Sequence, residues 1–161
     1  MTINIIVAVA ENLAIGYNNN LIYRISSDLK RFKALTTGNT VIMGRKTFES
    51  LPKGALPNRR NIVLSTTKSE FSGCDTYTSL NEALEHCSAD ENVFVIGGAS
   101  VYKEALAVAS HLYITEIKAT PEHADVFFPE YKEGWKEVSR EEHSKDEKNQ
   151  EDYAFVNYDR L

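Results

Sequence analysis

The stretch from Val93 to Tyr102 constrains the fold more than any other part of this sequence. It begins with the apolar run VFVI, continues with Gly97-Gly98, and enters a segment with the apolar spacing of a helix over residues 100–108. A short apolar run bounded by turn formers is typical of a strand that is buried on both faces. A buried strand, a glycine turn and a helix start leave free backbone N–H groups where a ligand can approach. A tight turn without any ligand is the alternative interpretation.

A second segment of the same kind lies upstream. Residues 40–44 predict another strand that ends in Gly44, and Arg45-Lys46-Thr47 follow at the start of a short helix over residues 46–50. Two such turns predict one diphosphate-containing ligand held between two helix N-termini. An anionic ligand needs a local basic cluster, for which the sequence offers Arg45, Lys46, Arg59, Arg60 and Lys68.

Length and composition limit the class of protein. A chain of 161 residues with no apolar stretch of about 20 residues predicts one domain without a membrane span. The net charge of −5 argues against nucleic acid and against an anionic membrane as partners. The first residues lack the pattern of a signal peptide, so we expect a cytoplasmic protein. Cys74 and Cys87 lack the spacing of metal ligands, and we expect reduced thiols and no metal.

The hydrophobic pattern predicts alternating strands and helices. A mostly apolar segment at residues 3–10 predicts a central strand. Residues 12–20 show neither the periodicity of a helix nor that of a strand, so they predict a long loop. Further elements are expected at residues 61–66 (strand), 76–78 (strand), 79–87 (helix) and 111–118 (strand).

The last third of the chain has a different pattern. Strands at residues 135–138 and 153–159 flank a polar run at residues 140–152, which predicts an antiparallel hairpin with the run as its solvated loop. The fold class is therefore α/β. We expect a single-domain, three-layer fold with a central, mainly parallel twisted sheet, an antiparallel C-terminal edge hairpin and about four flanking helices.

Asp28 is the strongest candidate for a chemical role. Ser26 and Ser27 are N-cap candidates for a helix whose apolar stripe contains Leu29 and Phe32, and Asp28 lies on the face of Phe32. A carboxylate on an apolar face is costly unless something binds it. Two carboxylate oxygens suit a flat heterocycle that carries an N–H beside an amino group. The alternative is an acid that only stabilises the helix dipole.

Other catalytic patterns are missing from the sequence. There is no GxSxG, HExxH or Walker motif, which leaves acyl transfer, zinc hydrolysis and ordinary nucleotide hydrolysis unsupported. The four histidines are scattered in polar contexts and are interpreted as surface residues: His86, His111, His123 and His143.

Over essentially its whole length, the sequence resembles a bacterial dihydrofolate reductase of the chromosomal type. The motifs that carry the resemblance occur in family order: IVAVA at residues 6–10, AIG at 14–16, DLKRFK at 28–33, VIMGRKTFES at 41–50, LPNRRN at 56–61, IGG at 96–98 with Tyr102, the pair Ile114-Thr115, and residues 125–129. The ordered set is far more specific than any one of these motifs.

The resemblance implies a reaction and its catalytic residues. The reaction is the NADPH-dependent reduction of 7,8-dihydrofolate to 5,6,7,8-tetrahydrofolate, with hydride transfer to pterin C6 and protonation at N5. Asp28 would pair with the pterin, Thr115 would bridge to Asp28, and Tyr23 would stand near the pterin in place of the usual tryptophan. The protein would also bind antifolate inhibitors and act as a monomer.

The resemblance also implies the binding residues. Those for the substrate are Ile6, Val7, Leu29, Phe32, Lys33, Leu51, Leu56, Arg59, Ile96 and Tyr102. Those for NADPH are Ala8, Ile15, Gly16, Gly44, Arg45, Lys46, Thr47, Leu64, Ser65, Thr66, Thr67, Ile96, Gly97, Gly98, Ala99, Ser100, Val101 and Tyr102.

Three structural expectations follow from the resemblance. The Gly97-Gly98 peptide should be cis, a loop at residues 11–24 should close over the nicotinamide, and residues 39–108 should form an adenosine-binding subdomain. The sequence departs from the family pattern at Ile22 and Ser26, where prolines are usual, and at Ser100, where many members have an arginine. Residues 53–55 are also one residue longer than common bacterial forms.

Two other function classes remain open at the level of sequence. A related reductase that acts on a pyrimidine or a riboflavin precursor would not need Asp28 together with Phe32 and Arg59. A non-catalytic nucleotide-binding module would keep the two glycine turns and lose the aspartate pocket.

Overall fold

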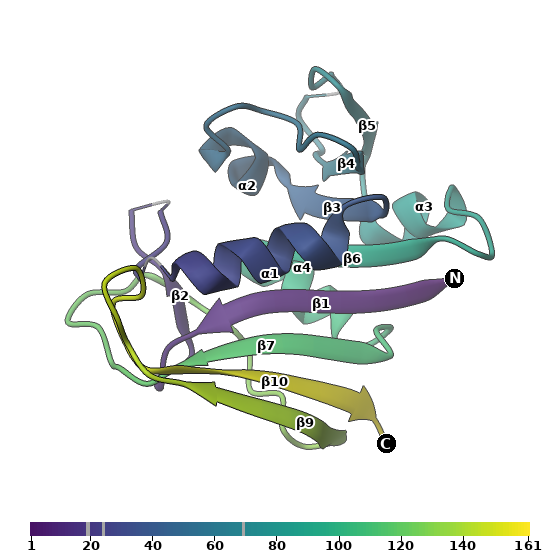
Figure 1. The fold of residues 1–161 in the computed structure, drawn as a ribbon. Helices are drawn as coiled ribbons and strands as arrows, with labels where there is room; N and C mark the ends of the chain where they lie inside the picture. The colour runs from purple at the N-terminus through teal and green to yellow at the C-terminus, as the bar shows by residue number, and fades with distance from the viewer. Residues whose placement is uncertain (19, 24, 69) are drawn as a thin grey trace.

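The computed structural model describes residues 1–18, 20–23, 25–68 and 70–161, and it shows a twisted eight-stranded sheet with helices on both faces (Figure 1). The elements are β1 Thr2–Val9, β2 Ala14–Gly16, α1 Ser26–Thr36, β3 Thr40–Gly44, α2 Arg45–Ser50, β4 Arg60–Leu64, β5 Cys74–Tyr77, α3 Leu80–Glu85, β6 Asn92–Gly97, α4 Ala99–Ala105, β7 His111–Ile117, β8 Val126–Phe127, β9 Trp135–His143 and β10 Tyr153–Arg160.

The large sheet has the order β5-β4-β3-β6-β1-β7-β10-β9. All neighbours from β5 to β7 are parallel, and β7-β10 and β10-β9 are antiparallel. The predicted α/β class, the mainly parallel sheet and the antiparallel C-terminal edge are therefore confirmed. The sequences of the parallel strands are apolar runs because helices cover both faces of the sheet.

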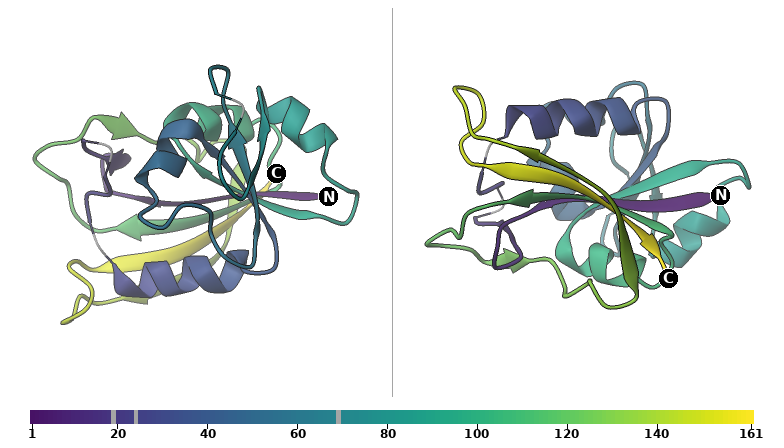
Figure 2. Two further views of the ribbon diagram at one scale, coloured as in Figure 1. Left: turned by 90° about the horizontal axis from the view of Figure 1, so that it is seen from above. Right: turned by 60° about the horizontal axis from the view of Figure 1, so that its bottom comes forward.

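Helix α1 covers one face of the sheet, and α3 and α4 cover the other (Figure 2). Strand β3 shows how the two faces are filled, because its side chains alternate between them. Ile42 belongs to the core cluster that includes residues of α3 and α4, whereas Val41 and Met43 belong to the cluster that contains Phe32 of α1. All three β3 side chains are fully buried.

The prediction of a loop without strand over residues 12–20 was wrong in part. Ala14–Gly16 forms β2, which pairs with β8 in a separate two-stranded sheet. The partner strand lies more than 100 residues away, so three residues of sequence gave no local signal for it. Asn19 and Arg24, which belong to the predicted closing loop at residues 11–24, lie outside the described residues.

The predicted serine N-cap of α1 was also wrong. The N-cap residue is Ile25, whose own side chain cannot accept a hydrogen bond from the first turn. Instead, the Ser27 backbone N–H donates a hydrogen bond to Asn149 Oδ1 at 3.0 Å, and Asn149 is buried. The distant hairpin loop therefore satisfies a donor that the local sequence was expected to satisfy.

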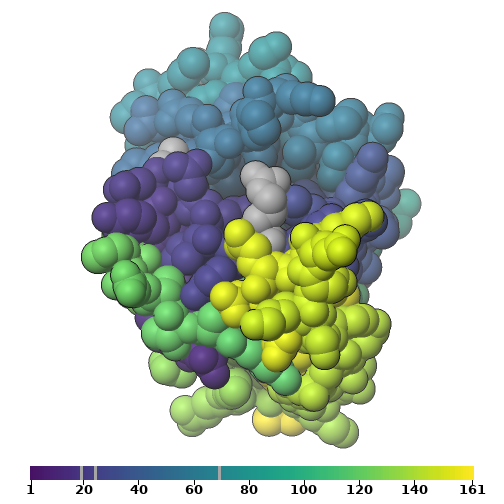
Figure 3. All heavy atoms as spheres, turned by 60° about the vertical axis from the view of Figure 1, so that its left-hand side comes forward, coloured from purple at the N-terminus to yellow at the C-terminus, as the bar shows by residue number. Residues whose placement is uncertain are grey.

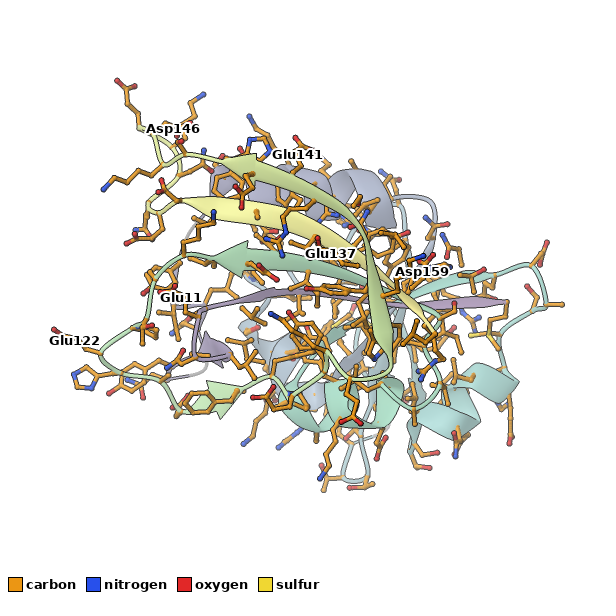
Figure 4. The ribbon with its side chains drawn as sticks, turned by 90° about the horizontal axis from the view of Figure 1, so that it is seen from below. Glu11, Glu122, Glu137, Glu141, Asp146 and Asp159 are labelled. Atoms are coloured by element: carbon orange, nitrogen blue, oxygen red, sulfur yellow. The ribbon has the colours of Figure 1, made fainter. Side chains whose placement is uncertain are left out.

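The C-terminal hairpin is longer than predicted. Strand β9 runs to His143, so residues 140–143 of the polar run are paired strand and not solvated loop. Nearly all β9 side chains are exposed, and the charges on this outermost strand protect the open edge of the sheet. Figure 4 shows Glu137 and Glu141 on β9.

The remaining elements differ from the prediction by a few residues at their ends. Ser79 is the N-cap of α3, where its hydroxyl accepts a hydrogen bond from the Glu82 N–H at 3.1 Å. Helix α4 ends at Ala105 and is followed by a turn, because the backbone N–H groups of Ala107 and Val108 bond to carbonyls three residues back.

We expect Ile42→Ala to destabilise the protein by about 2–5 kcal/mol, because it leaves a cavity in a fully buried part of β3. Urea unfolding measures this change. Val108→Ala is the matched control, since this side chain is 42% exposed and the expected effect is within about 0.5 kcal/mol. Equal losses in the two variants would contradict the assignment of Ile42 to the core.

Candidate active site

Asp28 lies in the first turn of α1, where its carboxylate faces the central sheet. The hydroxyl of Thr115, a buried residue of β7, donates a hydrogen bond of 2.5 Å to Asp28 Oδ1. The structure thus brings together the two predicted residues, which are 87 positions apart in the sequence. This bond fixes the carboxylate at the junction of α1 and the sheet.

Burial raises the pKa of Asp28 above its usual value of 3.8, because an ionised carboxylate is poorly solvated at this position. The hydrogen bond from Thr115 and the charge of Arg31 oppose this rise. Burial, with a smaller contribution from the Asp28 charge, also raises the pKa of Tyr102. A partly buried acid with a perturbed pKa is typical of a functional site.

An apolar cluster includes Phe32, which lies one helical turn after Asp28 on α1. Five predicted substrate residues belong to this cluster, which is built from β1, α1, the segment after α2 and the end of β6: Ile6, Phe32, Leu51, Leu56 and Ile96. Leu29 and Lys33 are exposed on α1 and are not part of this cluster. The cluster offers an apolar surface on which a flat heterocycle can pack.

The remaining predicted residues on this side belong to neighbouring clusters. Tyr23 and Ala8 pack against a small cluster formed by Ile25, Ile117 and Tyr153. Val7 and Tyr102 belong to the core on the opposite face, and the Tyr102 hydroxyl donates to the Ile6 carbonyl at 3.0 Å. Burial, with smaller contributions from Glu151 and Glu11, raises the pKa of Tyr23.

The two predicted glycine turns meet side by side. Because β3 pairs with β6 and Met43 is opposite Gly97, Gly44 comes to lie beside Gly97-Gly98. A Cβ atom on Gly44 would lie 3.8 Å from the Gly98 nitrogen. The peptide bond between Gly97 and Gly98 is cis, as the resemblance implied.

Thr47 completes this junction. A Cβ atom on Gly97 would lie 3.2 Å from Thr47 Oγ1, and Gly97 has a φ of +133°, which side chains rarely adopt. A side chain at this position would thus crowd the Thr47 hydroxyl and strain the backbone. The turn is open to a ligand because glycine occupies it.

The other predicted cofactor residues surround this junction or lie beyond it. Arg45 and Lys46 at the start of α2 and Ser100 in α4 are exposed. Leu64 is opposite Gly44 in the β3-β4 pair, so Ser65, Thr66 and Thr67 continue the chain from the same end of the sheet. Ala99 and Val101 are in the first turn of α4, and Ile15 and Gly16 are in β2.

The expectation of a single basic cluster was wrong. Arg60 begins β4 and Arg45 follows β3, and since these strands are parallel, the two cations lie at opposite ends of them. Arg60 is also neutralised, because it forms ion pairs of 2.9 Å with both Asp75 and Glu91. Lys68 lies over the ring of Phe71. Sequence proximity did not show which end of a strand each cation occupies.

Arg59 differs from Arg60 in that no acidic side chain of the described residues pairs with it. Its Nε donates to the Pro57 carbonyl at 2.9 Å, and its Nη1 donates to Thr36 Oγ1 at 3.0 Å. Burial lowers the pKa of Arg59. These two hydrogen bonds fix the position of the Arg59 guanidinium, which can still bind the carboxylate of a ligand.

Figure 3 looks onto the end of the molecule at which the parallel strands finish. The purple segment after β1 lies there beside the green segment after β7, and a hydrogen bond from the Glu11 N–H to the Ala119 carbonyl joins them. Ligands of open parallel sheets bind at this end of the strands. Asp28, the glycine junction and β2 all lie toward it.

Arg31 is the residue near Asp28 that sequence reasoning did not select. It follows Asp28 by three positions, a spacing that places both side chains on one face of α1 and could have indicated it. The described residues contain no group of three or more His, Cys, Asp or Glu side chains that could hold a metal ion.

Comparisons with known proteins agree with this arrangement. The family model described as dihydrofolate reductase matches residues 2–160. The dihydrofolate reductase of Bacillus subtilis is 46% identical over 98% of this chain and 94% of its own length, and that of Neisseria meningitidis is 44% identical over 98% of both. A solved structure of dihydrofolate reductase from Enterococcus faecalis, complexed with NADP(H) and RAB-propyl, has a TM-score of 0.90 at 35% identity and covers 99% of this chain and 96% of that one.

The sheet, the buried carboxylate and the paired glycine turns are those of a small α/β oxidoreductase. The matches define it more closely: this chain belongs to the dihydrofolate reductase family. None of the helices in the described residues is both long and apolar enough to span a membrane.

We expect Asp28→Asn to be more stable than the wild type at about pH 8, by roughly 0.5–2 kcal/mol. The raised pKa means that the folded state binds the Asp28 proton more tightly than the unfolded state does. Stability is therefore lost as the pH rises from the usual aspartate value through the folded-state value, and the amide avoids this loss. Urea unfolding at several pH values measures the difference, which should vanish in acid.

Asp90→Asn is the matched control for this prediction. Asp90 is fully exposed, and its pKa is lowered by the Ser88 hydroxyl, so its removal should not stabilise the protein at any pH. A lower free energy of unfolding for Asp28→Asn than for the wild type at about pH 8 would show that burial of the ionised Asp28 carboxylate does not destabilise the protein.

Proposed function

We propose that this protein catalyses the NADPH-dependent reduction of 7,8-dihydrofolate to 5,6,7,8-tetrahydrofolate in one-carbon metabolism, with hydride transfer to pterin C6 and protonation at N5. The observation that carries the proposal is the Asp28 carboxylate, which is held by Thr115 one helical turn before Phe32 of the apolar cluster. The family and the named activity of the relatives support the same reaction.

Asp28 is the acid suited to bind the pterin. Its two oxygens can accept from the ring N3–H and the adjacent 2-amino group, and the negative charge stabilises the protonated, cation-like form of the ring. Because the surrounding cluster is apolar, this charge acts with little screening. Asp28 orients the pterin and favours its protonated form, while the proton itself reaches N5 through water.

The apolar cluster and Arg59 would hold the rest of the substrate. Phe32, Leu51 and Leu56 would line the pterin and benzoyl groups, and Arg59 would bind the glutamate carboxylate as a two-pronged donor. The carbonyls of Ile6 and Ile96 would accept from the pterin. A pyrimidine or riboflavin-precursor reductase would need neither this carboxylate nor this arginine.

The glycine junction fits the cofactor. The space that a Cβ atom on Gly97 would fill lies against Thr47, so Thr47 and the backbone N–H groups after Gly44 and Gly98 can hold a diphosphate. Arg45, Lys46 and Thr66 would bind the 2′-phosphate, and Ser100 would contribute a neutral hydroxyl. NADPH, when bound, supplies the hydride, and Ile96 and Tyr102 would flank its nicotinamide.

Further proposals concern the organisation of the protein. Residues 39–108 would form the adenosine-binding subdomain, and the segment at residues 11–24 would close over the nicotinamide and exclude solvent. We also propose that the protein acts as a cytoplasmic monomer and binds antifolate inhibitors in the pocket of Asp28.

The reaction itself is tested by mixing the purified protein with NADPH and dihydrofolate and recording the loss of the NADPH absorbance. We expect turnover by the wild type and a fall of about 10²–10³-fold in Asp28→Asn at neutral pH, because the amide keeps the shape and removes the charge. The residual activity should increase as the pH falls, since the substrate then arrives protonated. Turnover within about threefold of the wild type would disprove the assigned role.

Arg59→Ala tests the site for the glutamate end of the substrate. We expect the KM for dihydrofolate to rise by an amount equivalent to about 1.5–3 kcal/mol, the value of a charge-assisted hydrogen bond. A small diaminopyrimidine inhibitor without a carboxylate should bind with nearly unchanged affinity. Because Arg59 also donates to buried Thr36, urea unfolding serves as the control, and equal weakening of both ligands would indicate a structural role.

A further inference from the structure

Arg31 is a partly buried cation beside Asp28 that none of the proposed contacts uses. Its guanidinium lies over the ring of Phe155, 4.5 Å from the centroid, and 5.7 Å from that of Tyr113. Its Nη2 donates a hydrogen bond of 2.5 Å to Asn157 Oδ1. These contacts tie α1 to β7 and β10 and fix the position of the guanidinium.

The charge of Arg31 is left without a close counter-ion. Its Nη1 is buried and has no hydrogen-bond partner, and no carboxylate of the described residues lies within ion-pair distance. A cation taken out of water in this way interacts strongly with charges that are a little further away. Asp28, three residues earlier on the same helix face, is one of these charges.

We propose that Arg31 is a positioning residue that acts through Asp28, and that its fixed positive charge keeps the Asp28 carboxylate ionised in a pocket that would otherwise favour the protonated acid. This inference rests on the proposed function, since it assigns a role in the same reaction. Arg31 touches neither the substrate nor the cofactor in this proposal.

The charges around the pair agree with this role. The polar and charged groups that act on Asp28 or Arg31 come from four elements: Thr115 and Tyr113 from β7, Tyr102 from α4, Glu141 from β9 and Asn157 from β10. The Thr115 hydroxyl and Arg31 lower the pKa of Asp28 against the effect of burial.

Glu141 lies on the outermost strand (Figure 4), and its side chain is 69% exposed. It also accepts a hydrogen bond from His143. Because its carboxylate is exposed and already partnered, it neutralises Arg31 less than a buried acid would. Arg31 is thus the cation of the described residues whose charge acts on Asp28.

The alternative is that Arg31 only fills space above the rings of Tyr113 and Phe155. Arg31→Met distinguishes the two roles, because methionine keeps an extended side chain that packs on aromatic rings and removes the charge. Arg31→Lys keeps the charge and loses the planar donor group. Lys30→Met is the matched control, since it removes an exposed cation from the next position on α1.

The first measurement is a carbon-13 NMR titration of the Asp28 carboxyl in the ligand-free protein. We expect the pKa of Asp28 to be higher in Arg31→Met than in the wild type, and nearly unchanged in Arg31→Lys and Lys30→Met. The second measurement is the pH profile of kcat/KM for dihydrofolate. In Arg31→Met, the part of the profile where kcat/KM rises as Asp28 ionises should move to higher pH. At neutral pH we expect kcat/KM to be roughly three- to thirtyfold lower than in the wild type, the size of effect seen for residues coupled in one network.

Two results would overturn the inference. One is an unchanged Asp28 titration in Arg31→Met, and the other is a loss of activity that is equal at all pH values, as expected for a packing role. If Arg31→Met does not fold, the comparison of Arg31→Lys with neutral Arg31→Gln decides, because the inference requires the two to differ in the Asp28 titration. The titration needs no turnover, so a wild type that fails to reduce dihydrofolate would reject the proposed function alone.

Discussion

The hydrogen bond from Thr115 to Asp28 ties the first turn of α1 to the central strand β7, and it does so at a carboxylate that burial disfavours. A buried charge persists when its surroundings provide enough compensation. Here the compensation comes from a hydroxyl on one strand and a guanidinium on the next helical turn, which is itself fixed by two aromatic rings and Asn157. The position of α1 on the sheet and the charge of the pocket therefore depend on the same few contacts.

The sheet topology provides the second half of the site. Strands β3 and β6 are far apart in the sequence, yet they are neighbours, and both end in glycine at the same edge. Parallel pairing thus converts two separate strand–glycine–helix segments into one junction, with Thr47 packed against it. The same topology separates cations that are close in sequence, since Arg45 and Arg60 lie at opposite ends of adjacent strands.

Local patterns predicted what depends on local physics. The apolar runs at β1, β3 and β6 identified buried parallel strands, and Asp28 on the face of Phe32 identified the acid of the candidate pocket. The family resemblance implied the long-range contact between Thr115 and Asp28, but two other long-range contacts were not predicted, because no period or spacing encodes them. The pairing of β2 with β8 and the hydrogen bond from the Ser27 N–H to Asn149 each depend on a partner more than 100 residues away. The charged run after residue 139 was expected to be a loop, although its first residues belong to β9. An exposed edge strand is as rich in charged residues as a loop, so composition could not distinguish the two.

The sequence by itself determined the α/β class, the two glycine turns and the family resemblance, because periodicity, glycine conformation and ordered motifs are properties of short segments. Tertiary structure alone decided which cations remain unpaired: Arg60 is neutralised by Asp75 and Glu91, while Arg59 meets no acid among the described residues. It also decided that Arg31 faces Asp28 from a partly buried position above Tyr113 and Phe155. The physical reason is that the effect of a charge depends on its distance from other charges and from water, and folding sets both distances.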